Sequence, residues 1–147
     1  MKELLFQSTP LFTAFILRLT AGLIMLPHGL QKLMGMFGGY GYKNTMAFFT
    51  DTMKLPWLIA FGIIWLESVG SVLLIAGFLT RLWAAAFIVL MAGAIITTNA
   101  RHGFFMNWFG TQTGEGYEYH LLFIGICLAL FITGGGNWSV DRLIVNR

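Results

Sequence analysis

Residues 57–100 read WLIAFGIIWLESVGSVLLIAGFLTRLWAAAFIVLMAGAIITTNA, and this stretch decides the fold class. It contains two apolar runs, 57–79 and 82–100, which are separated only by Thr80 and Arg81. The first run contains one charged residue and the second contains none. At a rise of 1.5 Å per residue, each run is long enough as a helix to cross a hydrocarbon core about 30 Å thick. The stretch therefore predicts two membrane-spanning helices joined as a tight antiparallel hairpin.

Two further apolar runs, 11–30 and 119–136, flank this hairpin. Across the chain 57% of the residues are hydrophobic and 10% are charged, whereas about 25% of the residues in a soluble domain are charged. An ordinary water-soluble fold is thereby excluded. The sequence predicts an all-α integral membrane protein: a single domain over residues 1–147 in which four helices form a bundle within the lipid bilayer. Four crossings place both termini on the same side of the membrane.

Charge and cysteine content exclude two classes of function. The nine Lys and Arg residues are scattered singly, so no basic cluster could follow a phosphate backbone, and nucleic-acid binding is not expected. Cys127 is the single cysteine and lies in an apolar run. One cysteine forms neither an internal disulfide nor a Cys-x-x-Cys pair, which excludes self-contained thiol–disulfide exchange.

The basic residues outside the spans divide four against four between the two sides of the membrane. The positive-inside rule therefore does not decide the orientation. We expect cytoplasmic termini, because Lys32 fits a buried site better than a loop.

Two longer connections, 35–56 and 101–118, lie on the side opposite the termini. Residues 46–49 of the first fit a short interfacial helix. The second is rich in aromatic residues among glycines, namely Phe104, Phe105, Trp108, Phe109 and Tyr117. We expect this connection to lie in the headgroup region rather than in water.

Arg18 and Glu67 are charged residues inside predicted spans, where a charge costs at least about 2.5 kcal/mol. Counted along the helices, their depths in the membrane differ by only about 5 Å, which predicts that they pair or share a polar network. The pair would be either a structural link between helices or part of a functional site. Small residues share the helical face of each charge: Gly22 and Gly29 with Arg18, and Gly70 and Ser71 with Glu67. Both charged faces are therefore expected to be packed faces.

A second polar group gathers at the membrane boundary opposite the termini, where adjacent antiparallel spans end. It contains His28, Lys32, His102 and Glu118, and with Glu67 it predicts a polar cavity open at one end. Glu118 shares a helical face with Gly125 and Ala129, whereas His120 lies about 200° away. We therefore choose Glu118 over His120 as a site residue.

Such a cavity could relay protons, hold a metal, or hydrogen-bond the polar head of an apolar ligand such as a quinone. The metal and haem alternatives are weaker, because the spacing gives no His-x3-His and no Glu-x-x-His pair. The remaining alternative is a set of ordinary interfacial His and Lys residues.

Several ordered motifs carry a resemblance to a known family. They are Leu17-Arg18-Leu19, His28-Gly29-Leu30-Gln31-Lys32, Glu67 with Gly70, Leu74-Ile75-Ala76-Gly77-Phe78-Leu79-Thr80-Arg81, His102-Gly103, Gly116-Tyr117-Glu118-Tyr119 and Gly134-Gly135-Gly136-Asn137-Trp138-Ser139-Val140-Asp141. Together they cover nearly the whole chain, which resembles the DoxX family. The resemblance implies a four-helix protein of the bacterial cytoplasmic (inner) membrane. It associates the chain with thiosulfate:quinone oxidoreduction, with detoxification of catechols and quinones, and with membrane oxidoreductase complexes in oxidative-stress defence. The positions that match the family pattern are Arg18, His28, Lys32, Glu67, Arg81, His102, Glu118 and Asp141.

The leading hypothesis is a redox-associated protein, either a quinone-linked oxidoreductase or a subunit of one, that binds a quinone or similar apolar aromatic ligand within the bundle. We expect His28 and Lys32 to contact the ligand's polar head, with His102 beside them. Glu67 and Glu118 would take or relay protons, so that His28, Glu67 and Glu118 form the catalytic set. The ligand-binding set is Arg18, Lys32 and His102, with Arg18 orienting Glu67. Two alternatives are a non-enzymatic subunit that organises soluble redox partners and a small-molecule or lipid carrier; self-association into a homo-oligomer is compatible with all three.

Overall fold

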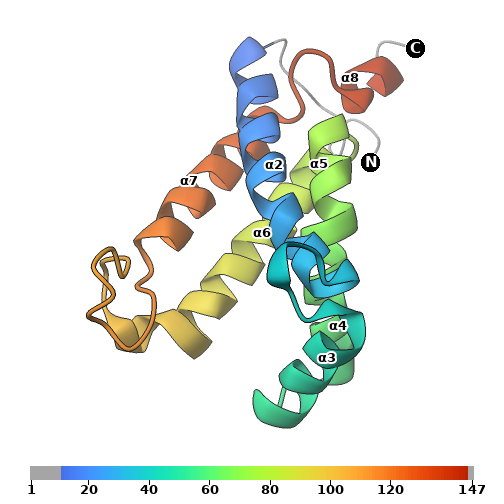
Figure 1. Ribbon diagram of the computed structural model, residues 1–147. Coiled ribbons are helices and arrows are strands. Elements are labelled where there is room, and N and C mark those ends of the chain that lie inside the picture. The colour runs from blue at the N-terminus through green and yellow to red at the C-terminus, as the bar shows by residue number, and fades with distance from the viewer. Residues whose placement is uncertain (1–10, 146–147) are drawn as a thin grey trace.

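The computed structural model describes residues 11–145 and contains helices and turns but no strand in that range (Figure 1). In chain order the elements are α2 (Phe12–Met34), η1 (Met36–Gly38), α3 (Gly41–Ala47), η2 (Phe48–Thr52), α4 (Trp57–Trp65), η3 (Leu66–Gly70), α5 (Ser71–Ala76), α6 (Thr80–Ala94), η4 (Ile95–Asn99), η5 (Ala100–His102), α7 (Glu118–Thr133) and α8 (Val140–Val145). The segments η2, η3 and η4 are π-helical. The predicted all-α fold is confirmed.

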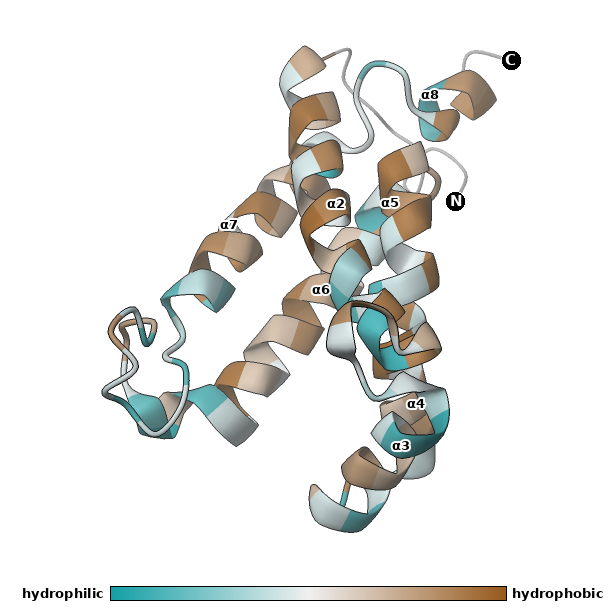
Figure 2. Cartoon of the chain, in the orientation of Figure 1, coloured by the Kyte–Doolittle hydropathy of each residue, from teal (hydrophilic) through white to brown (hydrophobic). Residues whose placement is uncertain are grey.

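Three continuous helices are long and apolar enough to cross a membrane: Phe12–Met34, Trp57–Ala76 and Thr80–His102. A shorter apolar helix, Glu118–Thr133, is the fourth. Large apolar side chains are exposed along all four, among them Leu23, Leu58, Val89 and Leu122, and Figure 2 shows hydrophobic residues along much of α2, α5, α6 and α7. Outward apolar faces of this kind match a lipid environment. The chain is a membrane protein.

The hairpin between the second and third spans differs from its predicted position. The sequence places the turn at residues 80–81, whereas α5 ends at Ala76 and α6 already begins at Thr80. The turn contains Gly77 and Leu79 with φ of 71° and 54°. The Asp141 carboxylate accepts hydrogen bonds from the backbone N–H groups of Leu79 at 2.6 Å and Thr80 at 2.9 Å. A cap supplied by a residue 61 positions further along the chain starts the helix earlier than the apolar run does.

The four spans pack as two pairs. The second span packs through η3 and α5 against α2, and α6 packs along α7. Figure 1 shows the pairs crossing near the end where the described chain begins and ends, and spreading apart toward the opposite end. At that end the Asn137 backbone N–H donates a hydrogen bond to the Leu11 carbonyl at 3.2 Å. The main apolar core joins the pairs through residues such as Leu74, Phe87, Phe123 and the buried Cys127.

Glycines bring α2 into backbone contact with the second span. A Cβ atom on Gly29 would lie 2.3 Å from the Glu67 carbonyl oxygen, and one on Gly22 would lie 2.4 Å from Cγ1 of Ile75. Gly22, Gly29, Gly70 and Ser71 are all buried. The prediction that the faces of Arg18 and Glu67 are packed faces is confirmed.

The corresponding prediction for the fourth span is wrong. Gly125 is exposed and a Cβ there would meet nothing within 4 Å. The buried face of α7 is instead formed by Phe123, Cys127 and Leu130. These larger side chains fill the core against α6 and leave the glycine on the outer side.

Candidate functional site

Arg18 is fully buried, and its guanidinium bonds only to backbone carbonyls. Its Nε donates to Gly135 at 2.7 Å, and Nη1 donates to Ile75 at 2.6 Å and Leu74 at 3.4 Å. Nη2 donates to Asn137 at 3.1 Å and Trp138 at 3.2 Å. These carbonyls belong to the end of α5 and to the segment after α7, where helix ends leave carbonyl oxygens without intrahelical donors. The predicted pair of Arg18 with Glu67 is therefore wrong.

The surroundings of Arg18 explain this difference. The segment Gly134–Gly136 folds over the side chain, with φ of 75° at Gly134 and 67° at Gly136. Asp141 is close enough to attract the guanidinium electrostatically, although its carboxylate bonds to the start of α6. Arg18 thus ties the first span, the hairpin and the C-terminal segment together at one end of the molecule.

Glu67 pairs with Lys32. The Lys32 ammonium nitrogen lies 2.5 Å from Oε2 of Glu67, and the two side chains are 25% and 8% exposed. Lys32 lies in the last turn of α2, beyond the predicted end of the first span at residue 30, and Glu67 lies in η3. The same ammonium is 3.5 Å from the His28 carbonyl. The structure therefore joins two of the predicted site residues in one ion pair.

Local backbone geometry presents Glu67 to α2. A π-helical turn widens the helix and redirects its side chains, and such turns are frequent at functional sites. Ser71 donates to the Glu67 carbonyl at 2.7 Å and Ser68 donates to the Ile64 carbonyl at 2.6 Å. These hydroxyls satisfy carbonyl groups in and beside the widened turn, while Gly29 lets α2 approach it closely.

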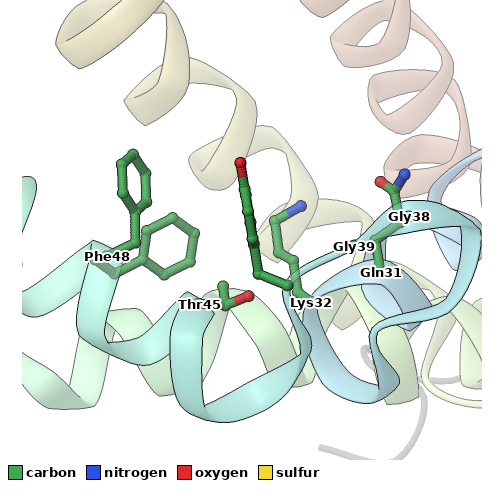
Figure 3. Close-up of a pocket in the computed structure, with 8 residues that line it drawn as sticks. Gln31, Lys32, Gly38, Gly39, Thr45 and Phe48 are labelled. Carbon is green, nitrogen blue, oxygen red and sulfur yellow. The ribbon is translucent and has the colours of Figure 1, made fainter.

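Lys32 of this ion pair also lines a pocket of about 280 Å³, whose lining residues are drawn in Figure 3. Its lining comes from the end of α2 and from the connection that follows, with Gln31, Lys32, Gly38, Gly39, Tyr40, Thr45, Phe48 and Phe49. Figure 3 shows the Lys32 side chain between Thr45 on one side and Gln31 on the other. Lys32 is thus shared: it lines the pocket and holds Glu67 behind it.

Sequence reasoning identified Lys32 and offered Tyr40 as an aromatic residue that could cover a cavity, but it did not select the Thr45 hydroxyl or the Phe48 and Phe49 rings. Tyr40 is the N-terminal boundary residue of α3, Thr45 lies within α3 and Phe49 lies in η2. For this segment the sequence predicts only a short interfacial helix at residues 46–49. Met46 and Phe49 are buried against α4 residues Ala60 and Ile64. The alternation of these buried residues with exposed Lys43 and Asp51 was the available signal for a helix folded back over the end of α2.

His28, His102 and Glu118 do not join the Lys32–Glu67 pair. The His28 side chain is exposed on α2. The Glu118 carboxylate accepts hydrogen bonds from the Met106 N–H at 3.1 Å and from Nε1 of Trp108 at 3.0 Å. The predicted five-residue cavity is therefore divided, because α7 diverges from α2 toward this end of the molecule.

His102 is the last residue of the third span and contacts the connection that follows. Its Nε2 accepts a hydrogen bond from Nε of Arg101 at 3.1 Å, and its Nδ1 lies 3.2 Å from the Thr113 hydroxyl. Within residues 11–145 no group of three or more His, Cys, Asp or Glu side chains is arranged to hold a metal ion.

Comparisons with known proteins agree on the family. The DoxX family model matches residues 13–100. The chain is 35% identical over 129 residues to the Bacillus subtilis (strain 168) protein named "Putative oxidoreductase CatD", covering 88% of this chain and 84% of that one. It is 30% identical over 144 residues to the Mycobacterium tuberculosis (strain ATCC 25618 / H37Rv) protein named "Uncharacterized membrane protein Rv3486", covering 89% and 80% of the two chains. No solved structure matches significantly. With more than half of its length matched by the family model and two relatives aligned over most of theirs, this chain belongs to the DoxX family.

Proposed function

We propose that this protein binds a quinone or a similar small aromatic ligand in the pocket beside Lys32, with Glu67 as the proton-handling group behind it. The observation that carries the proposal is the shared position of Lys32, which lines the pocket and lies 2.5 Å from Glu67. The relative named as an oxidoreductase supports a redox role.

The pocket has the chemistry that a quinone needs. Its volume of about 280 Å³ is near the lower limit of ligand pockets, about 300 Å³, which suits a single ring. Tyr40, Phe48 and Phe49 offer aromatic surfaces against which a planar ring can stack. An ammonium group has three donors; one is given to Glu67, and another can bond a ligand carbonyl.

The burial of the pair favours a function beyond helix packing. Charges inside a membrane protein are costly and by default indicate a functional site. Apolar residues of similar volume often stabilise a fold as well as a buried ion pair does. Glu67 can accept a proton from Lys32 or return one to it, so protons can move between the pocket and the bundle interior.

The other predicted residues receive different roles in this proposal. Arg18 has a structural role, because all its bonds are to backbone carbonyls. Glu118 and His102 organise the connection before α7. His28 is exposed one turn before Lys32 on the same face of α2 and does not line the pocket. Soluble redox partners would supply electrons.

The membrane in which the protein works is part of the same proposal. We place it in the bacterial cytoplasmic membrane with cytoplasmic termini, so that the pocket faces the other side. Labelling of Lys43→Cys by a membrane-impermeant thiol reagent in intact cells would test this orientation, because Cys127 is buried.

Binding of a short-chain benzoquinone to protein in lipid nanodiscs tests the ligand site. Losing a charge-assisted hydrogen bond costs about 1.5–3 kcal/mol, so Lys32→Gln should weaken the affinity by at least tenfold. Glu67→Gln, which removes the charge that holds the Lys32 ammonium in place, should also weaken it. Lys43→Gln is the matched control, since Lys43 is exposed on the neighbouring α3 and does not line the pocket. Unchanged affinity in both site variants, with their fold intact, would refute the assignment.

A further inference from the structure

The connection between η5 and α7, residues 103–117, exposes a cluster of large aromatic side chains. Phe104, Phe105, Trp108 and Phe109 are 45%, 66%, 77% and 89% exposed. No charged residue occurs from position 103 to position 114. An exposed aromatic cluster without charges marks a surface that contacts something other than water.

The backbone beneath these side chains is held in place by several hydrogen bonds. They run from Tyr117 N to Gly103 O (3.2 Å), from Glu118 N to Phe104 O (2.9 Å), from Asn99 Nδ2 to Glu115 O (3.0 Å), from Asn107 N to Glu115 Oε2 (2.8 Å), and from Met106 N and Trp108 Nε1 to Glu118 Oε1. Gly116 packs so closely on Phe104 and Phe105 that a Cβ there would lie 2.2 Å from the Phe105 carbonyl oxygen. The connection therefore presents its aromatic side chains from a fixed base.

Helix lengths set the depth of the connection in the bilayer. At the other end of the molecule the start of α6 lies beside the end of α7, where the Arg81 side chain donates to the Ile132 carbonyl at 2.9 Å. From there the third span runs for 23 residues and α7 for 16, a difference of seven. At 1.5 Å per residue α7 begins about 10 Å short of the end of the third span. At about 24 Å it is also shorter than the hydrocarbon core of about 30 Å.

The hydrogen bonds agree with this depth. Asn99, which binds Glu115, lies three residues before the end of the third span at His102. Glu115 and Gly116, which lead back toward α7, therefore lie beside the last turn of the third span. Figure 1 shows the connection beside the end of α6 and η5.

We propose that residues 103–114 form a membrane-embedded cap that completes the fourth span, with Phe105, Trp108 and Phe109 inserted among lipids of the leaflet opposite the termini. The partner of this surface is the bilayer itself. Trp is enriched at membrane interfaces, and exposed Arg101 lies where its guanidinium can reach lipid phosphate groups while its stem stays in apolar surroundings. A soluble protein partner would require the cap to project into water, which the helix lengths oppose.

Spin labels in pure phospholipid vesicles test this placement without any other protein present. In a Cys127→Ala background, labels are attached to Phe105→Cys and Phe109→Cys, with Val89→Cys as the lipid-facing reference and Asp51→Cys as the water-facing reference. Val89 is exposed in mid-α6, and Asp51 is exposed in η2. We expect both cap labels to collide several-fold less with an aqueous nickel chelate than the Asp51 label, and readily with oxygen. Nickel accessibility equal to that at Asp51 would overturn the proposal.

A measurement on the chain with its own cysteine guards against variants that do not fold. The tryptophan fluorescence that Trp108→Phe removes should be quenched by lipids brominated near the carboxyl end of their acyl chains. If aqueous iodide quenches that component and the brominated lipids do not, the cap lies in water and the proposal is wrong. Neither measurement involves the ligand pocket, so this proposal stands or falls independently of the proposed function.

Discussion

The contact of Gly29 with the second span leaves no room for a side chain. In Gly29→Ala the new Cβ would lie 2.3 Å from the Glu67 carbonyl oxygen and 2.4 Å from both the Glu67 carbonyl carbon and the Ser68 nitrogen. All three are backbone atoms, so no rotamer change relieves the clash. Ordinary contacts require about 3.5–4.0 Å, so α2 must move from η3 by roughly 1 Å or more.

Overpacking this close contact should lower the free energy of unfolding by about 1–3 kcal/mol. Replacing glycine by alanine inside a helix acts in the opposite direction and raises the free energy of unfolding by about 1 kcal/mol. Gly62→Ala isolates this second effect, because Gly62 is exposed in α4 and a Cβ there meets nothing within 4 Å. The difference in free energy of unfolding between the two variants therefore reports the clash alone.

Cys127 provides the assay. It is the single cysteine of the chain and is fully buried, so a thiol-reactive dye becomes fluorescent only when the bundle opens on heating. We expect Gly29→Ala to melt about 2–12 °C below Gly62→Ala, using about 2–4 °C per kcal/mol for a chain of this size and a clash of about 1–3 kcal/mol. Equal melting temperatures would refute the reasoning, because they would show that α2 and η3 separate without cost.

Three further predictions concern the polar contacts at the two ends of the molecule. Arg18→Met should lower the free energy of unfolding by more than about 3 kcal/mol, because it leaves several buried carbonyls without donors; a loss below 1 kcal/mol by the same thiol assay would contradict the structural role. Asp141→Ala should cost about 1–2 kcal/mol by removing the cap of α6, and hydrogen exchange should increase at Leu79 and Thr80 while the rest of the helix stays protected. Glu118→Ala should increase hydrogen exchange at residues 104–109, whereas Glu118→Gln, which keeps an acceptor oxygen, should change it little; equal effects would mean that charge rather than hydrogen bonding holds the connection.

Helical periodicity predicted the direction of the intramembrane charges but not their partners. Arg18 and Glu67 both face packed glycines, as spacing along a helix requires. The partners of Arg18 are backbone carbonyls of Gly135, Ile75 and three other residues, and a carbonyl is present at every position of every sequence. No pattern of residue types could have distinguished these five.

The pocket was missed for a related reason. Its lining depends on α3 and η2 folding back over the end of α2, and on a positive φ of 53° at Phe37, a residue type that rarely adopts it. The π-helical turn that aims Glu67 at Lys32 also has no sequence signature in the chain. The spacing of small residues predicts the wrong inner face for α7, because Phe123 and Leu130 fill the core there.

The two buried charges differ in how easily each could change its bonding partners, and this difference favours Glu67 over Arg18 as the group that reacts. Arg18 bonds to five carbonyls from two separate segments of the chain, so releasing it would require several parts of the fold to move together. Glu67 is held by one flexible side chain, Lys32, which is itself a quarter exposed and borders the pocket. In the proposed function, a ligand that bonds to the ammonium can therefore draw Lys32 away from Glu67 without unfolding any helix. A fully satisfied charge stabilises a structure, whereas a charge held by a single movable partner can take part in a reaction.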